Sequence, residues 1–540
     1  MADAQGGDNT SQNLNRRRFL GAAATTFATL ALAPVACTSD RPGERTLDTA
    51  VIGGGIAGLY AAWRLAGDHV SPDQIAVFEA TDRIGGRLLS MNMPGTSGLV
   101  AEFGGMRFLT SQRIVTALVQ HLGIEVRPFP MGGPENLVYL RGKRWTAADY
   151  ARPGAISYAL TASEAGNDPT ALMVKAIRAL VPDGETLGPE KWNTVKRQLT
   201  LDGRPLSDWG FWEFLNRYLS YEAVMLVDDG GGYCSIPREW NAAEALPWLL
   251  ADFGNNPEYK TIVKGMDTLP EQISNALQDK GTAVNTGYRL ESLRVPSERD
   301  GSHELTFATA DGSQSMKARR VILAMPQQAI ERIPDCPALK GSAAAALLGT
   351  ITLRPLAKAF IAHAEPWWRR LGLFSGRAVT DLPARQFFYF GTEPGRPAGP
   401  SGAATMAYFD EPLIEFWSGM RNLEQPNSTG LTMLDPNGPM VRELVRQIIT
   451  VHDLKEPPAV LSAGYINWGD EPYVSGWHTW KQGVKSWEVM PAVRTPLPGT
   501  DLHIVGEAWS TDQGWIEGAL QTVEALLVED LKLAPPAWLR

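Results

Sequence analysis

The chain has 540 residues, of which 44% are hydrophobic and 20% charged, a composition typical of globular proteins and not of disordered ones. The formal net charge is -9, whereas a protein whose main task is nucleic-acid binding would carry a basic surplus. The 3 Cys are too few for a disulfide framework, and neither they nor the 7 His show metal-ligand spacing. The 53 Gly suggest tight turns and close approach of the backbone to a ligand.

The first 45 residues predict an export signal. The basic segment Arg16–Arg18 precedes an apolar run, Gly21–Val35, that is shorter than the ~20 residues needed to span a bilayer. This order resembles the signals read by the twin-arginine translocation machinery. The resemblance implies a periplasmic or extracellular protein that is cleaved near Ala33 or Ala36, or else lipid-anchored at Cys37. A short membrane anchor that stays uncleaved is the alternative.

A glycine-rich turn opens the folded part of the chain. The segment Leu47–Ile52 predicts a buried strand, Gly53–Gly58 a turn, and Leu59–Leu65 a helix. This is the order of the dinucleotide-binding fingerprint. In it Gly53 makes the turn, Gly55 lets the backbone approach a pyrophosphate, and Gly58 lets helix and strand pack closely. Ile56 and Ala57 lie at the helix start, where free N–H groups meet the phosphates.

The second strand of the fingerprint ends at an acidic residue. The strand Gln74–Phe78 is followed by Glu79 and Ala80, and Glu79 comes 21 residues after Gly58. This spacing suits a carboxylate that accepts the ribose hydroxyls of the cofactor. The fingerprint alone does not separate NAD from FAD.

The segment Arg83–Ser90 makes that distinction. It reads Arg-Ile-Gly-Gly-Arg-Leu-Leu-Ser and resembles the R-x-G-G-R-x-x-S motif of the FAD-dependent amine oxidoreductases. The resemblance implies FAD as the cofactor, with contacts from Gly86 and Arg87. Both Arg83 and Arg87 can meet a diphosphate with charge-assisted hydrogen bonds.

Distant segments continue the resemblance. A strand over Asp501–Val505 ends at Gly506 and Glu507, and Gly514–Leu520 resembles the carboxy-terminal motif of the family. The resemblance implies that Glu507 contacts the ribityl and diphosphate region, and that a helix beginning at Gly514, Trp515 and Ile516 directs its N–H groups at the flavin. Leu290 occupies the place of a residue whose backbone meets the adenine. No Cys occurs in Ser510–Gln513, so the resemblance implies non-covalent FAD.

Within this family, the segment Ala101–Phe108 resembles the G-x-M-R segment of bacterial L-amino-acid oxidases. The resemblance implies that Arg107 holds the substrate carboxylate, because a planar guanidinium can form two parallel bonds to it. It places Gly104, Gly105 and Met106 beside the cofactor. A structural ion pair is the alternative role for Arg107.

Further site residues follow from the same resemblance. Tyr389 matches a tyrosine that also binds the carboxylate, and Lys358 matches the lysine that reaches flavin N5 through a water. Trp477 and Trp515 would form walls around the reacting carbon. The alternatives are a buried aromatic strand for Tyr389, a solvent-facing edge-strand position for Lys358 and plain core packing for Trp477.

The predicted fold class is α/β. A Rossmann-like FAD-binding domain is interleaved with a mixed-sheet substrate domain and a helical insertion. The expected ranges are 1–45 for the signal and linker; 46–90, 261–330 and 485–540 for the FAD-binding domain; 91–131 and 331–484 for the substrate-binding domain; and 132–260 for a helical domain that covers the substrate. Within the insertion, Asp228–Gly232 predicts a flexible break between helices.

The resemblance implies oxidation of L-amino acids to 2-oxo acids by dioxygen, with release of ammonia and hydrogen peroxide. A decarboxylating, amide-forming amino-acid 2-monooxygenase and an amine oxidase of the same superfamily are alternatives, as is a flavoprotein without turnover. A homodimer is compatible with each of them. Side-chain preference stays open, since the aromatic walls favour large substrates and the acidic residues of the insertion favour basic ones.

Overall fold

The computed structural model describes residues 46–539, apart from 68, 153, 235, 237, 255–256, 297–300 and 394–401. The predicted export signal, with Cys37, lies outside the described residues. In the part of the chain that is described, no helix is both long and apolar enough to cross a membrane. The described residues form one unit, which contains two large sheets and a group of helices.

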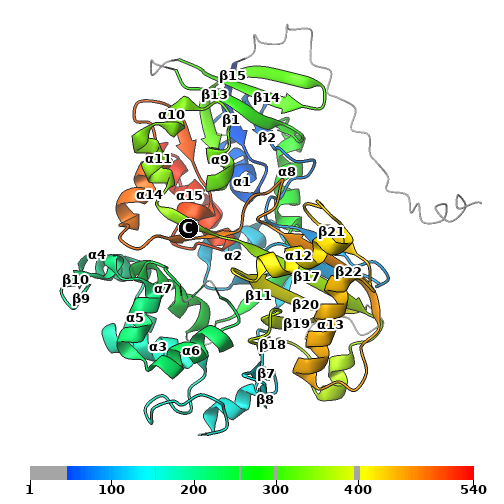
Figure 1. Ribbon diagram of the computed structural model, residues 1–540. Helices are drawn as coiled ribbons and strands as arrows, with labels where there is room; N and C mark the ends of the chain where they lie inside the picture. The colour runs from blue at the N-terminus through cyan, green and yellow to red at the C-terminus, as the bar shows by residue number, and fades with distance from the viewer. Residues whose placement is uncertain are drawn as a thin grey trace, which may run out of the picture. The chain divides into compact units, whose positions relative to one another are not determined.

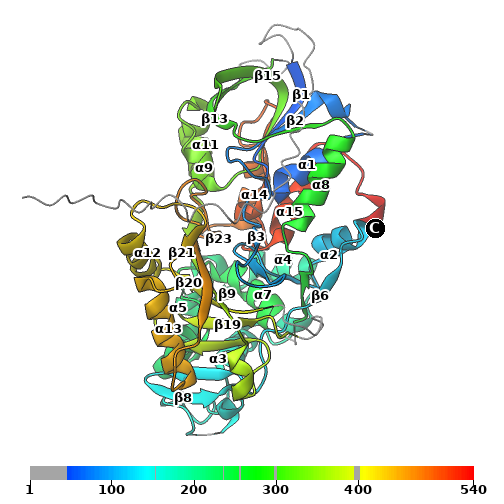
Figure 2. The same ribbon diagram turned by 90° about the vertical axis from the view of Figure 1, so that its right-hand side faces the viewer.

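The first large sheet is built around β1 (Thr46–Ile52), whose last four residues are all buried. It runs parallel to β2 (Ile75–Phe78) and to β15 (Gly312–Leu323). Central parallel strands need cover on both faces. Val51 and Val77 pack on one face against α1 (Ile56–Leu65), α8 (Thr268–Asp279) and α15 (Ile516–Ala525), which lie together in both views (Figures 1 and 2).

This sheet brings the ends of several strands together. Its order is β12 (Ala283–Asn285), β2, β1, β15, β14 (His303–Thr309) and β13 (Arg289–Arg294), with β24 (Leu502–Ile504) parallel to β15. Ligands of doubly wound sheets bind beyond the carboxyl ends of the parallel strands. Gly53, Glu79 and Glu507 follow three of these strands, so the topology gathers three predicted cofactor residues at one edge.

The second large sheet is mainly antiparallel. Its order is β21 (Thr432–Leu434), β22 (Val460–Asn467), β17 (Leu356–His363), β20 (Ala403–Asp410), β19 (Gln386–Phe390), β18 (Arg377–Thr380), β7 (Leu137–Leu140) and β8 (Lys143–Thr146). On one face it packs against α12 (Ile414–Glu424) and α13 (Pro439–His452), seen beside it in Figure 2. The other face carries Phe360, Phe388 and Met406 toward the site.

A helical group follows β8 in the chain. It contains α3 (Pro169–Leu180), α4 (Pro189–Gln198), α5 (Phe211–Tyr218), α6 (Tyr221–Gly230) and α7 (Ala242–Phe253), drawn in green at the lower left of Figure 1. These helices share one core of their own, to which Leu172, Phe211 and Leu246 contribute. The helix α6 continues to Gly230, so the break expected over Asp228–Gly232 is wrong for its first three residues.

Short elements connect these parts. Three small sheets are β3 (Ser90–Asn92) with β4 (Val100–Glu102), β16 (Ile351–Arg354) with β23 (Trp477–Trp480), and β9 (Thr200–Leu201) with β10 (Arg204–Pro205). A fourth has the order β5 (Phe108–Leu109), β11 (Tyr259–Ile262) and β6 (Val126–Pro128). The remaining α-helices are α2 (Arg113–His121), α9 (Gln327–Glu331), α10 (Pro337–Lys340), α11 (Ser342–Leu348) and α14 (Ser486–Arg494).

The predicted α/β class is confirmed: a mostly parallel sheet with helices, a mixed sheet and a helical group are all present. The domain ranges stay a prediction. The strands β7 and β8 lie within the range 132–260 that was predicted to be helical. They pair with the second large sheet through β18. The strand β17, which carries Lys358, is separated from β16 by Pro355, which has no N–H to donate to a ladder.

Candidate active site

The glycine turn after β1 has a shape that only glycine permits at two positions. Gly53 has φ of +112°, and a Cβ there would lie 2.4 Å from the carbonyl oxygen of Ala324. A Cβ on Gly58 would lie 2.0 Å from the carbonyl oxygen of Gly53. α1 then begins at Ile56 with no side-chain capping bond, so its first N–H groups are left for a ligand.

We expect Gly58→Ala to disrupt this turn. The added methyl must push α1 away from β1, which costs about 1–3 kcal/mol of unfolding free energy as overpacking does elsewhere, and moves the phosphate-binding N–H groups. Flavin absorbance after gel filtration and urea unfolding would measure both losses. Gly419→Ala is the matched control, because Gly419 lies in α12 with no heavy atom within 4 Å of the new Cβ. The prediction is contradicted if both variants retain the flavin equally.

Glu79 lies at the end of β2, beside the same turn. Its Oε2 accepts a hydrogen bond of 2.8 Å from the Gly54 N–H, and its Oε1 accepts bonds from the N–H and the hydroxyl of Thr81 at 2.9 and 2.8 Å. These bonds fix the carboxylate at the edge where the parallel strands end. This is the place that the fingerprint predicts for a ribose-binding acid.

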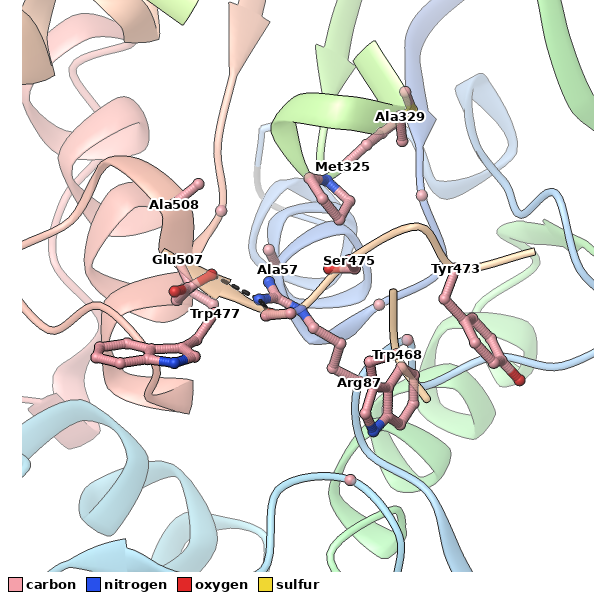
Figure 3. Close-up of a pocket in the computed structure, with 18 of the residues that line it drawn as sticks. Ala57, Arg87, Met325, Ala329, Trp468, Tyr473, Ser475, Trp477, Glu507 and Ala508 are labelled. Atoms are coloured by element: carbon pink, nitrogen blue, oxygen red, sulfur yellow. Dashed lines mark hydrogen bonds and ion pairs between the residues drawn. The ribbon is translucent and has the colours of Figure 1, made fainter. Parts of the chain in front are cut away.

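The two arginines of the R-x-G-G-R motif have different surroundings. Arg87 Nη1 donates to the carbonyl oxygen of Gly476 at 2.7 Å and to Glu507 at 2.6 Å (Figure 3). Arg83 instead donates to carbonyl oxygens of its own loop, at Gly86 and Leu88, and to the Tyr473 hydroxyl. The expected phosphate contact of Arg83 is therefore wrong: its donors hold the loop, and it does not line the cavity described below.

Glu507 joins the two ends of the chain. Its Oε1 accepts from the N–H groups of Gly514 at 2.7 Å and His478 at 3.1 Å, and its Oε2 accepts from Arg87 and from His478 Nδ1 at 3.0 Å. Burial alone would raise the pKa of this carboxyl, but Arg87 and His478 lower it to about 2. Both oxygens are thus occupied by protein groups, so Glu507 orients Arg87 and the start of the Gly514 segment.

A cavity of about 630 Å³ runs along these groups. Apart from Gly58, Arg83 and Tyr389, every predicted site residue lines it: Gly53, Gly55, Ile56, Ala57, Glu79, Ala80, Gly86, Arg87, Gly104, Gly105, Met106, Arg107, Leu290, Lys358, Trp477, Glu507, Gly514, Trp515 and Ile516. Gly58 lies one turn into α1, where it serves packing, as predicted. The cavity thereby connects the edge of the first sheet with the apolar face of the second.

Lys358 points from β17 toward this cavity. Its Nζ donates to the backbone carbonyl oxygens of Glu102, at 3.0 Å, and Gly104. Burial lowers the pKa of Lys358, and the nearby Glu102 carboxylate only partly offsets this. The solvent-facing edge position is excluded, since the side chain is 2% exposed and β17 is flanked by β20 and β22.

A hydrogen-bond network holds the backbone to which Lys358 donates. The Glu102 carboxylate accepts from the Ser90 hydroxyl at 2.7 Å and from the Met266 N–H at 3.0 Å. Asp267 in turn accepts from the Ser90 N–H at 3.0 Å. The network links Ser90 and Glu102 with Met266 and Asp267, which lie far along the chain, and no spacing rule predicts this connection.

Arg107 directly precedes β5 and is 8% exposed. Its guanidinium carbon lies 5.0 Å from the Tyr259 ring centroid, 5.6 Å from that of Trp515 and 5.8 Å from that of Phe129. Such an enclosure of aromatic rings stabilises a cation where water is excluded.

The charge of Arg107 is preserved, although its hydrogen bonding is incomplete. Burial opposes the charged form, but Tyr233, Asp252 and Tyr259 raise the pKa above its usual value. The buried Nε has no hydrogen-bond partner among the described residues. The structural ion pair that was the alternative is not seen in the described part of the chain, and a donor is left for a ligand.

Tyr389 does not reach the site. Its hydroxyl lies 2.7 Å from His452 Nε2, and its ring packs with the core beneath α13. Successive side chains of a strand point to opposite faces, so its neighbour Phe388 faces the site instead. The expected carboxylate contact of Tyr389 is therefore wrong, and the alternative of a buried aromatic strand describes it.

Two other tyrosines lie where Tyr389 was expected. Tyr408 on β20 is the register partner of Lys358, and its ring centroid lies 5.6 Å from Lys358 Nζ. The Tyr233 ring contacts it at 5.3 Å and 84°. Burial raises the pKa of Tyr408 well above its usual value, so its hydroxyl stays a hydrogen-bond donor. Strand pairing identifies Tyr408 and a ring contact identifies Tyr233, and no sequence motif marks either one.

The tryptophan wall is larger than predicted. Trp477 stacks on Trp248 of α7 with centroids 6.0 Å apart, and Trp248 approaches Trp515 at 6.3 Å. The Trp248 indole N–H donates to the carbonyl oxygen of Gln513 at 2.9 Å. The helical group thus supplies part of the wall of the cavity. Trp248 has the spacing of an ordinary core residue of α7, so its sequence gives no sign of this role.

No cluster of three or more His, Cys, Asp or Glu suited to a metal ion occurs among the described residues. The side chains that converge on the cavity include arginines, a lysine, tyrosines and tryptophans, together with four carboxylates. They can hold an anionic group, exclude water and supply a titratable amine.

Known proteins resemble the chain over most of its length. It is 25% identical to Aplysianin-A of Aplysia kurodai, with 95% of this chain and 96% of that protein covered. It is 26% identical to an L-amino-acid oxidase of Sistrurus catenatus edwardsii, with 63% of this chain and 62% of that protein covered.

A solved structure of wild-type putrescine oxidase bound to putrescine shares the fold. It has a TM-score of 0.65 at 19% identity and covers 91% of this chain and 100% of that chain. The model of the family described as flavin containing amine oxidoreductase matches residues 56–523. That match spans most of the chain, which therefore belongs to this family and is an FAD-dependent oxidase.

Proposed function

We propose that the protein oxidises L-amino acids to 2-oxo acids, releasing ammonia and passing electrons to dioxygen to give hydrogen peroxide. The observation that carries this proposal is the buried Arg107, whose charge faces the cavity and whose Nε has no partner among the described residues. A guanidinium in such surroundings suits a carboxylate ligand, which supplies both the missing acceptor and the countercharge. The L-amino-acid oxidase among the relatives supports the same reading.

The cavity fits FAD by its own geometry. Its glycine turn has no room for a Cβ at Gly53 or Gly58, the first turns of α1 and α15 are uncapped by side chains, and Glu79 and Arg87 are fixed beside them. Glu79 would hold the ribose, the α1 start and Arg87 the diphosphate, and the Gly514–Ile516 segment the flavin ring. When bound, FAD supplies the acceptor for the hydride of the substrate Cα and returns the electrons to dioxygen.

The residues of the chain position the amino acid and its protons. Arg107 binds the α-carboxylate, and the hydroxyls of Tyr233 and Tyr408, which line the same cavity, can donate further hydrogen bonds to it. Trp248, Trp477 and Trp515 exclude water around Cα.

Proton handling falls to Lys358. Since burial lowers its pKa, Nζ can take up or release a proton near neutral pH, at a water held in the cavity. An amino acid that binds with a neutral α-amine needs no stronger base.

The rival activities differ in what they require of Arg107. A simple amine has no carboxylate, so an amine oxidase would leave a buried arginine without a ligand. An amide-forming monooxygenase would use the same carboxylate site. It differs from the proposed oxidase in its products and not in its site residues.

Anaerobic mixing with amino acids is the decisive test. We expect the 450 nm flavin band to bleach with at least some of the twenty L-amino acids and not with putrescine. Admission of air should restore the band and yield peroxide in equal amount to the 2-oxo acid. An amide product with little peroxide would identify the monooxygenase, and an unbleached band with all twenty would exclude the proposed function.

Export by the twin-arginine route, with cleavage near Ala33 or Ala36 or acylation at Cys37, stays a proposal from the sequence, as does a homodimer. Replacing Arg16 and Arg17 by Lys should retain the protein in the cytoplasm of a host with that route. Unchanged export of the double variant would contradict the proposal.

A further inference from the structure

The substrate end of the cavity opens toward a second one of about 790 Å³, which lies between the helical group and the second large sheet. Tyr233, Ile236 and Asp252 line both cavities, so they mark the junction. Asp252 is the penultimate residue of α7, and it is 2% exposed. A carboxylate thus lies at the point where a substrate side chain would leave the flavin site.

Asp252 differs from the other carboxylates that line the first cavity. Glu507 is paired with Arg87, and Glu471 with Arg332 at 2.5 Å. Glu79 accepts three hydrogen bonds from the turn beside it. Asp252 accepts one from the Tyr259 hydroxyl, at 2.8 Å, and has no ion pair within 4.0 Å among the described residues. A buried carboxylate of this kind is costly unless a cation supplies its partner.

Tyr259 connects Asp252 with the predicted carboxylate site. The face of its ring lies 5.0 Å from the guanidinium carbon of Arg107, while its hydroxyl donates to Asp252. The positive charge of Arg107 and the carboxylate of Asp252 are therefore separated by the side chain of Tyr259. An amino acid with a charged side chain also carries two opposite charges, separated by several bonds.

We propose that Asp252 selects substrates with a cationic side chain, such as lysine, ornithine or arginine. This inference rests on the proposed function. With the α-carboxylate on Arg107, the side chain extends toward the junction of the two cavities, and its ammonium or guanidinium pairs with the Asp252 carboxylate. The rings of Tyr259 and Trp248 add cation–π contacts to such a group.

Four other charged side chains line the second cavity. Asp168 and Glu258 add negative charge to its wall, whereas Lys260 and Arg377 add positive charge. Asp168 accepts from the Ala171 N–H as the cap of α3, and Arg377 donates to Gln386. Asp252 alone among these charged residues also lines the first cavity.

Matched substrates test the proposal without any variant. L-lysine and L-norleucine differ mainly in the terminal charge, as do L-arginine and L-citrulline. We expect kcat/KM for the charged member of each pair to exceed that of its neutral partner by roughly 10- to 100-fold, the usual value of a charge-assisted hydrogen bond. Equal values, or a preference for the neutral members, would overturn the proposal.

Variants then assign the preference to Asp252. Asp252→Asn should lower kcat/KM for lysine and arginine by roughly 10- to 100-fold more than it lowers kcat/KM for norleucine and citrulline. Asp252→Glu should keep much of the preference. Glu258→Gln is the matched control, because Glu258 is exposed and lines only the second cavity, not the first. The Glu258→Gln variant should prefer charged substrates as strongly as the wild type does.

The results with Asp252→Asn distinguish substrate selection by Asp252 from an indirect effect on Arg107. An equal fall for charged and neutral substrates in Asp252→Asn would mean that Asp252 positions Arg107 through Tyr259, which overturns the proposal. A preference that survives in Asp252→Asn also overturns it. Flavin absorbance and the melting temperature show whether each variant is folded, and the wild-type pairs decide the question if Asp252→Asn is not. A wild-type flavin that no amino acid reduces would instead sink the proposed function.

Discussion

Arg107→Ala is expected to lower kcat/KM for L-amino acids by roughly 10³-fold while FAD stays bound. The α-carboxylate would enter a buried site without its countercharge, and leaving a buried charge unpaired costs about 2–5 kcal/mol. The enclosing rings of Tyr259, Trp515 and Phe129 would remain, so apolar contacts with the substrate would persist. Steady-state peroxide kinetics and the 450 nm absorbance of the purified variant measure the two parts of this prediction.

Two further variants make this result specific. Arg107→Lys keeps the charge but not the planar fork of donors, so it should recover only part of the activity. Arg217→Ala is the control, because Arg217 lies on the surface in an exposed ion pair with Asp202. Near-normal kinetics of Arg107→Ala would remove this residue from the substrate site.

Glu507→Gln is expected to weaken FAD binding strongly and to destabilise the protein by about 3 kcal/mol. The carboxylate is 3% exposed and accepts hydrogen bonds from Arg87, His478 and Gly514. An amide cannot serve all these donors or neutralise Arg87. Retained flavin after gel filtration and urea unfolding at pH 7 test both effects.

Acid provides a second check on Glu507. Its pKa in the folded protein is about 2, below the ordinary value of 4.5. The ionised carboxylate therefore stabilises the fold fully above pH 4.5, and this contribution is lost as the pH falls toward 2. The difference in unfolding free energy between wild type and Glu507→Gln should shrink over that interval. Glu213→Gln, in an exposed ion pair with Arg204, should show almost no difference at either pH.

Local sequence patterns predicted which residues line the cofactor part of the cavity. A strand, a glycine turn and a helix within 20 residues suffice to form the phosphate-binding edge, because their geometry depends on neighbours in sequence. β1 and α1 occur there as Thr46–Ile52 and Ile56–Leu65, and Gly53 and Gly58 occupy positions where a Cβ has no room. The family motifs extended this to Arg87, Glu507 and Trp515, all of which line the cavity.

Errors arose where a side chain's direction depends on distant strands. Tyr389 and Phe388 are neighbours in an apolar strand, and which of them faces the site depends on the register of β19 with β20. A shift of one residue exchanges the two faces of a strand. Arg83 and Arg87 belong to the same motif, and the sequence does not distinguish their roles. Only Arg83 donates to Tyr473, far along the chain, and to carbonyl oxygens of its own loop.

By itself, the sequence determined the fold class, the cofactor and the presence of Arg107 at the cavity, because these depend on short motifs with fixed local geometry. Only the tertiary structure placed Tyr408 beside Lys358, Trp248 over Trp515, and Asp252 beside the ring that covers Arg107. Each of these contacts joins elements far apart in the chain. Their side chains have the composition of ordinary core or helix positions, so only the packing of strands and helices gives them a common site.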